Sequence, residues 1–306
     1  MTMQADPVDV AERRRPVSRL RARINFAVFS VVAAGGGWLF AALDRATGQV
    51  VGTGSVTSTS GGTNGQGLWI AVPALTALVL YFVSRDGAGP LGFTLRFADR
   101  ARWFGFAAGL SPITTAVAAA AAVATGVATF SGTPVAGKPP FAEAFVTAIG
   151  FLLVKNLLEE FIFRGYGTRT AMALGLRGVA PHLLVGLVWG LWHLPLYTVW
   201  MSRADFRQST SLPWGWYLPL FFAGIMALAV LYGEMRVRTG SIWPGVVLHT
   251  VSNALVTPLL VNGHLRFEGH GDALFGVAPN SVLSILLFGG TGLFLLRRRN
   301  RISGPA

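Results

Sequence analysis

Three short stretches of the 306-residue sequence place hydrophilic side chains in otherwise apolar surroundings. The residues concerned are Glu159, Glu160 and Arg164 in "NLLEEFIFRGYG", His193 in "VWGLWHLPLY", and His249 and Asn253 in "SIWPGVVLHTVSN". A carboxylate in such a place can take a proton from water, and a neutral histidine can hold the same water. A second histidine and an amide can donate hydrogen bonds to a developing oxyanion. Together these groups predict hydrolysis of an amide by an activated water, without a covalent intermediate.

Helical spacing would give the two glutamates separate roles. Glu160 and Arg164 lie one turn apart in the favourable acid-first order. Glu159 points about 100° away from Glu160. Lys155, one turn before Glu159, can pair with it or extend toward the membrane surface. The simpler interpretation of this stretch is an interfacial salt bridge beside a solvated acid.

The two histidines also have helical neighbours. His193 follows Trp189 by one turn, and Pro195 is expected to kink the helix just beyond. His249 and Asn253 are four residues apart and share one face. Each histidine also has a structural interpretation, as a packing residue or as a polar contact between helices. From the helical rise, we expect all three stretches to reach one layer in the cytoplasmic half of a membrane.

The composition indicates which elements must position these groups. The chain is 52% hydrophobic and only 12% charged, whereas soluble domains carry about a quarter charged residues. It has no cysteine, which excludes disulfides, thiolate metal sites and cysteine nucleophiles. Apolar runs long enough to span a bilayer lie near 25–43, 68–84, 103–126, 141–163, 179–200, 215–235, 241–261 and 280–296. We therefore expect an all-α, polytopic membrane helical bundle of about eight transmembrane helices.

The distribution of basic residues indicates an orientation. With a cytoplasmic N-terminus, most arginines fall in inside segments, namely 13–23, 85–102, 164–177, 236–238 and 297–301. The outside loops then hold only Arg45, Lys138, Arg203, Arg207 and Arg266. By the positive-inside rule, both termini are cytoplasmic. The net charge of +12 is explained by topology and contact with the lipid bilayer, so we expect no nucleic-acid partner.

The chain divides into three parts. Residues 1–24 are expected to form a disordered basic cytoplasmic tail, and residues 297–306 a second basic cytoplasmic tail. Between them, residues 25–296 form a single transmembrane domain with its catalytic core at about 141–262. The Gly/Ser/Thr-rich stretch 52–67 is expected to be a flexible outer loop.

Taken in order, "EEFIFRG", "WGLWHLP" and "SIWPGVVLHTVSN" resemble the three motifs of the CPBP family, which includes type II CAAX prenyl endopeptidases and bacteriocin-processing, Abi-like proteins. Trp189 stands where phenylalanine is usual. The resemblance implies that Glu159 is the general base and that His193 helps to position the water. It implies that His249 and Asn253 stabilise the oxyanion, and that Glu160 and Arg164 are a supporting pair.

The resemblance also implies an activity and a location. It implies an intramembrane endopeptidase that cleaves a peptide bond near the C-terminus of a membrane-associated substrate, such as a prenylated CAAX-type tail. In a host without protein prenylation, the substrate would be another membrane-bound peptide. The site is expected to open to the cytosol. We expect an integral protein of a bacterial cytoplasmic membrane.

Other functions use the same residue types. In a zinc-dependent variant of the peptidase, the metal ligands would be Glu159, His193 and His249. However, the sequence contains no H-E-x-x-H motif. We therefore expect no cofactor and no metal. A non-catalytic bacteriocin-immunity or scaffolding protein would keep the motifs, and a transporter or proton relay also uses intramembrane Glu and His. An aspartic protease is excluded, because the aspartate of "GHGD" lies in an expected outer loop and none of the expected spans contains an aspartate.

Overall fold

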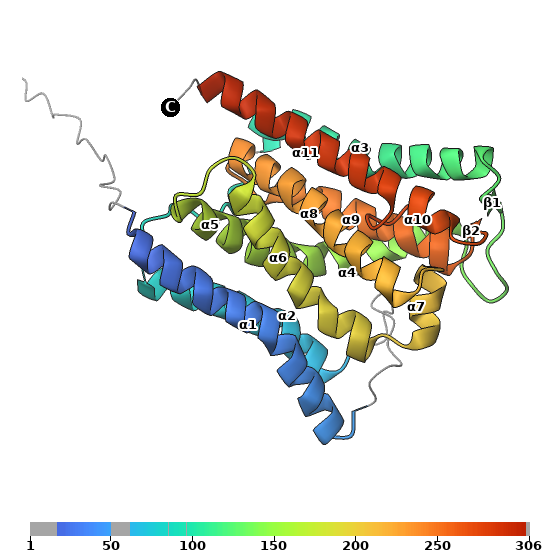
Figure 1. The fold of residues 1–306 in the computed structure, drawn as a ribbon, viewed down its shortest axis with the longest axis horizontal. Coiled ribbons are helices and arrows are strands. Elements are labelled where there is room, and N and C mark those ends of the chain that lie inside the picture. The colour runs from blue at the N-terminus through green and yellow to red at the C-terminus, as the bar shows by residue number, and fades with distance from the viewer. Residues whose placement is uncertain (1–16, 50–61, 85, 96, 304–306) are drawn as a thin grey trace, which may run out of the picture.

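The computed structural model describes residues 17–49, 62–84, 86–95 and 97–303, and these residues are mainly helical (Figure 1). The long helices are α1 (Arg19–Ala46), α2 (Asn64–Ser84), α3 (Phe97–Ala124), α4 (Phe141–Glu160), α6 (Ala180–Pro195), α8 (Trp214–Thr239), α9 (Trp243–Val256) and α11 (Val282–Ser303). The short helices are α5 (Arg169–Ala173), α7 (Arg203–Ser209) and α10 (Gly271–Phe275). Strands β1 (Ala128–Phe130) and β2 (Leu265–Phe267) pair antiparallel, a feature that the sequence did not predict.

Seven helical segments in the described residues are long and apolar enough to cross a membrane, which confirms the all-α membrane fold and makes the chain an integral membrane protein. The eighth expected span is α11, a 22-residue helix beside α8. Its last two turns hold Arg297, Arg298, Arg299 and Arg301, which lower its hydropathy. The estimate of about eight spans is therefore close.

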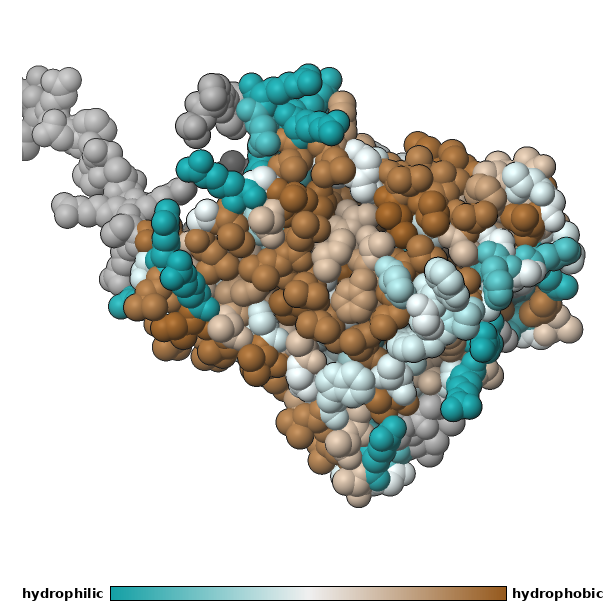
Figure 2. All heavy atoms as spheres, viewed as in Figure 1, coloured by the Kyte–Doolittle hydropathy of each residue, from teal (hydrophilic) through white to brown (hydrophobic). Residues whose placement is uncertain are grey.

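The outer surface of the bundle suits a bilayer. Large apolar side chains that point outward include Val79 and Val83 on α2 and Leu286 and Phe294 on α11. Figure 2 shows hydrophobic side chains over the middle of the molecule and hydrophilic ones gathered toward its edges. Because hydrocarbon offers no hydrogen bonds, helices with their backbone groups paired internally are the form expected there.

The helices at the two ends of the chain extend beyond the expected spans. Helix α1 begins at Arg19, so residues 19–24 belong to it rather than to a tail, and the Ser18 hydroxyl accepts a hydrogen bond from the Arg21 amide. Helix α11 continues to Ser303 through residues expected in the second tail. Arginine is a good helix former, which explains both extensions. Residues 1–16 and most of the expected outer loop 52–67 lie outside the described residues.

The bundle has two ends of different composition. We call one the basic end: it contains the start of α1, the segment 86–95, α5 and the end of α11. There Arg169 donates a hydrogen bond from Nε to the Gly89 carbonyl over 2.6 Å. The opposite end contains α7, α10 and the two strands, on the right in Figure 1. There Asp272 accepts a hydrogen bond from the Thr210 hydroxyl over 2.6 Å.

Buried contacts fix α6, the helix that carries His193, against α2 and α8. The indoles of Trp69 on α2 and Trp192 on α6 stack with centroids 4.0 Å apart, and each donates to the other's backbone carbonyl. Near the basic end, buried Glu234 on α8 lies 2.9 Å from His182 on α6 and 3.1 Å from Arg299 on α11. His182 is therefore a buried packing residue.

Each of the three motif helices passes into a π-helical segment. These segments are η1 (Phe161–Thr168) after α4, η2 (Leu196–Trp200) after α6 and η3 (Thr257–Val261) after α9. The change at Pro195 coincides with the kink expected there. Pro258 lies in η3, and proline cannot donate the amide hydrogen that an α-helix needs. Such π-helical turns are frequent at functional sites.

Candidate active site

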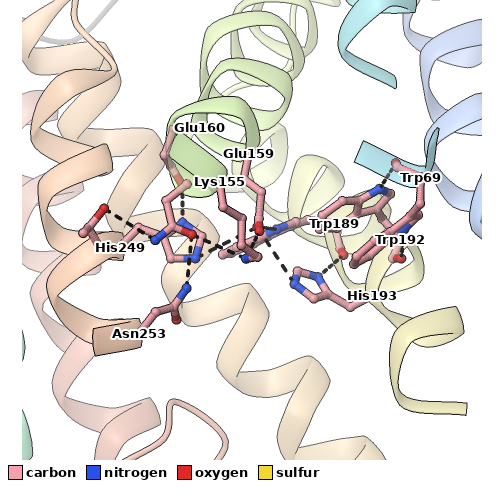
Figure 3. Close-up of polar contacts among 11 residues, drawn as sticks. Trp69, Lys155, Glu159, Glu160, Trp189, Trp192, His193, His249 and Asn253 are labelled. Carbon is pink, nitrogen blue, oxygen red and sulfur yellow. Dashed lines mark hydrogen bonds and ion pairs between the residues drawn. The ribbon is translucent and has the colours of Figure 1, made fainter. Parts of the chain in front are cut away.

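Three helices bring the candidate residues together (Figure 3). Glu159 and Glu160 lie at the end of α4, His193 on α6, and His249 and Asn253 on α9. Both glutamates are 0% exposed. Burying a carboxylate is costly unless it is paired, so each must have close partners.

Glu159 lies between the two histidines, as Figure 3 shows. Its Oε2 atom is 4.0 Å from the Nε2 atoms of both His193 and His249. The indole of Trp189 donates to the same oxygen over 3.4 Å. The other oxygen, Oε1, is paired with the ammonium of Lys155, so Lys155 does not extend to the membrane surface. One carboxylate oxygen is thus held, and the other faces both imidazoles.

The orientation of His193 fixes which of its nitrogens carries hydrogen. Its Nδ1 lies 2.9 Å from the Trp189 carbonyl, one turn earlier in α6. A carbonyl oxygen only accepts, so Nδ1 must donate. In the neutral ring, Nε2 then carries the lone pair. This lone pair is on the nitrogen nearest Glu159, which suits binding a water hydrogen.

Glu160 supports His249 rather than Glu159. Its Oε1 accepts a hydrogen bond from His249 Nδ1 over 3.0 Å. Its Oε2 lies 3.6 Å from Arg164 Nε, in the expected one-turn ion pair. A carboxylate on one imidazole nitrogen fixes the ring's orientation and leaves the other nitrogen for chemistry. The site therefore holds two carboxylates beside two cations, Lys155 and Arg164.

Gly245 allows α9 to approach Glu160 this closely. A Cβ atom at Gly245 would lie 2.8 Å from Glu160 Oε2, closer than carbon and oxygen can come without a shift. Gly245 is four residues before His249, on the same face of α9. No role for Gly245 was predicted from the sequence.

A second asparagine, also missed from the sequence, holds Asn253. The Asn253 side-chain amide donates to Asn156 Oδ1 over 3.1 Å. Asn156 is 0% exposed and lies four residues before Glu160 on α4. The signal available in the sequence was an asparagine in an apolar span, one turn before Glu160. Asn253 itself lines a cavity and has a second amide hydrogen for a ligand.

A cavity of about 240 Å³ reaches the candidate residues. Lys155, Trp189, His193, His249 and Asn253 line it near Glu159. Its other walls are mainly apolar or aromatic, with contributions from α4, α6, α8 and α9. A peptide bond inside this cavity would have a carboxylate, two imidazoles and an amide around it.

The arrangement does not suit a metal ion. Among the described residues, no group of three His, Asp or Glu side chains is placed to hold one. Glu159, His193 and His249 were the candidate ligands, but the Lys155 ammonium already occupies one oxygen of Glu159. A dication would be repelled by this ammonium and by Arg164. We therefore derive no step through a metal.

Comparison with known families identifies this part of the chain. Residues 141–255 match the family model described as type II CAAX prenyl endopeptidase Rce1-like. The match covers 115 of the 306 residues, so this part of the chain is similar to that family. No curated protein matches the chain.

The matched region coincides with the elements that build the site. It begins at Phe141, the first residue of α4, and ends within α9, two residues after Asn253. All six candidate residues lie inside it, with Asn156 and Gly245. The family's description, a CAAX prenyl endopeptidase, names a peptidase. Helices α1, α2, α3 and α11 lie outside the match and pack around the domain.

Proposed function

We propose that the protein is an intramembrane endopeptidase in which Glu159 activates a water that hydrolyses a peptide bond. The supporting observation is the position of Glu159 Oε2, 4.0 Å from the Nε2 atoms of both His193 and His249. This separation is too long for direct hydrogen bonds. It fits one water that is hydrogen-bonded to the carboxylate and to a histidine, each over about 2.8 Å.

The first step is proton transfer from this water. The water donates one hydrogen to Glu159 Oε2 and the other to the lone pair of His193 Nε2. Glu159 takes the first proton as the water oxygen bonds to the carbonyl carbon of the substrate. The C=O π electrons move to oxygen and give a tetrahedral oxyanion. General-base catalysis of this kind contributes about 10²–10⁴-fold to a rate.

The oxyanion needs hydrogen-bond donors that are already in position. Asn253 has one amide hydrogen on Asn156 and a second for the oxyanion. In its protonated form, His249 keeps its Nδ1 hydrogen on Glu160 and offers its Nε2 hydrogen. When the C–N bond breaks, the proton held by Glu159 passes to the leaving nitrogen. The carboxylate is then restored for another cycle.

The substrate we propose is a membrane-associated peptide or protein cleaved near its C-terminus. The cavity walls support an apolar peptide segment, because Leu196, Phe221, Ile225 and Leu260 line it. An apolar side chain buried there contributes about 25 cal/mol for each Å² removed from water. A prenylated CAAX-type tail is the substrate suggested by the family's description.

The test is peptide profiling with the purified full-length protein in detergent. We expect cleavage of apolar peptides at a defined position, with the same rate before and after treatment with a chelator. The absence of any cleavage by well-folded protein would contradict the proposal, in favour of a scaffolding or immunity role. Loss of cleavage with chelator and its recovery with zinc would contradict the metal-free mechanism only.

A further inference from the structure

The cavity extends from the catalytic layer in only one direction. Along α6, its lining residues run from Trp189 to Met201, and along α9 they run from His249 to Val261. Both series lead away from the basic end and toward the opposite end of the bundle. The cavity's last walls are α7, through Asp205, and the loop before α11.

The bundle is filled on the other side of the catalytic layer. The Arg164 guanidinium lies 4.1 Å from the ring centroid of Trp189 and 5.0 Å from that of Tyr232. Arg164 is 1% exposed, and Phe163 and Tyr166 beside it are 0% exposed. These buried side chains lie between Glu159 and the basic end.

The distribution of basic residues indicates which end of the bundle faces the cytoplasm. The helix ends and loops of the basic end carry Arg19, Arg21, Arg23, Arg100, Arg102, Arg169, Arg177, Arg236, Arg238, Arg297, Arg298, Arg299 and Arg301. The opposite end holds Arg45, Lys138, Arg203, Arg207 and Arg266. Segments rich in arginine and lysine remain on the cytoplasmic side. The basic end is therefore cytoplasmic, and the cavity leads to the other face.

From this geometry we infer that the substrate enters from the extracytoplasmic side of the membrane. The substrate class is an apolar peptide segment anchored at the outer leaflet or exposed on the outer surface. This inference rests on the proposed peptidase function but opposes the cytosolic opening expected from the resemblance. A prenylated tail on the cytoplasmic face would have to pass the buried layer of Arg164, Trp189 and Tyr232.

The absence of cysteine makes this inference directly testable, because each introduced cysteine is the only thiol. Ala136→Cys reports the opposite end, Ser209→Cys the mouth of the cavity, and Leu176→Cys the basic end. Intact cells are treated with a membrane-impermeant maleimide, and a second sample is treated after permeabilisation. The cysteine-free parent is the control for background labelling.

We expect Ala136→Cys and Ser209→Cys to be labelled in intact cells, and Leu176→Cys only after permeabilisation. The reverse pattern, or equal labelling of all three in intact cells, overturns the inference. A bulky maleimide on Ser209→Cys should also lower kcat/KM by roughly an order of magnitude, because it obstructs substrate positioning. The same reagent on Ala136→Cys should leave the rate unchanged.

The labelling experiment tests the entry side, and the cleavage assay tests the peptidase proposal, so either proposal can be contradicted without the other. Reversed labelling with active purified enzyme would overturn the extracytoplasmic entry and leave the peptidase proposal standing. Labelling as expected, with no cleavage of any peptide in detergent, would contradict the peptidase proposal. The orientation of the cavity would then still hold, as the entry route of some other ligand.

Discussion

At the residue scale, the site is a set of polar groups with divided tasks. Glu159 has one oxygen fixed by Lys155 and one facing two imidazoles. His193 and His249 each use Nδ1 for a structural partner and present Nε2 to Glu159. The motif residues could be predicted from the sequence, because ionisable groups in apolar spans are conspicuous. Asn156 was missed because its partner, Asn253, lies 97 positions away in the sequence.

Asn253→Ala tests the oxyanion role. Removing one oxyanion donor typically lowers kcat by about 10²–10³-fold. We expect a loss of this size with little change in KM, and a smaller loss for Asn156→Ala, which only positions Asn253. The measurement is steady-state cleavage of the best peptide from profiling. Ser252→Ala, at a neighbouring cavity residue, is the matched control. A change in KM alone would assign Asn253 to substrate binding instead.

At the element scale, two antiparallel helices present matching faces. Asn156 and Glu160 lie one turn apart on α4, and Gly245, His249 and Asn253 follow one another at the same interval on α9. Glu160 faces Gly245 and His249, while Asn156 faces Asn253. The sequence predicted that His249 and Asn253 share one face, because the four-residue interval is visible in it. It did not assign Asn156 or Gly245 to these faces. It did not predict which residues meet, because that depends on how far one helix is shifted along the other.

Gly245→Ala should damage this interface at one point. The new methyl group would displace the Glu160 carboxylate and leave His249 without its orienting partner. We expect kcat to fall by roughly an order of magnitude or more, since small misplacements in active sites are costly. Peptide cleavage and thermal unfolding are measured together.

Gly150→Ala on α4 is the matched control for that change. A Cβ atom there meets nothing within 4 Å, so the substitution should keep activity and stabilise the helix slightly. Full activity of Gly245→Ala would show that the close approach to Glu160 is not needed for catalysis.

The stability contributed by the contacts among α1, α5 and the segment after α2 should depend on pH. Asp86 is buried, and burial acts to raise the pKa of its carboxyl. Hydrogen bonds from Arg169, the Ala88 amide and Asn25 outweigh burial and hold this pKa below its usual value. A carboxyl with a lowered pKa in the folded state contributes stability above its unfolded pKa. That contribution is lost as pH falls through the folded pKa.

We therefore expect thermal stability to fall through this group as the pH drops below about 4, the ordinary pKa of an aspartate in the unfolded chain. Asp86→Asn should be less stable than the parent at neutral pH, and the difference between the two should shrink as the pH falls. The measurement is thermal unfolding in detergent across this range. Asp99→Asn, in the exposed first turn of α3, is the control. A constant difference between Asp86→Asn and the parent at every pH would contradict the assignment.

At the scale of the whole molecule, hydropathy predicted the fold, and the charge distribution predicts an orientation that the labelling experiment tests. Apolar runs mark the helices because every spanning segment must satisfy its own backbone in hydrocarbon. The π-helical segments, the small sheet and helix α7 carry no comparable signal, because tertiary contacts decide them. The direction of the cavity was also hidden from the sequence. It depends on Arg164 packing between Trp189 and Tyr232, side chains brought together from three helices.

We propose above all that the Glu159 carboxylate is the base that activates water. The most direct test is the kcat of Glu159→Gln on a peptide that the parent protein cleaves. Glu143→Gln, at the exposed start of the same helix, is the matched control. We predict a loss of about 10²–10⁴-fold for Glu159→Gln with unchanged folding, and none for Glu143→Gln. Cleavage by well-folded Glu159→Gln at a rate close to that of the parent would contradict the account.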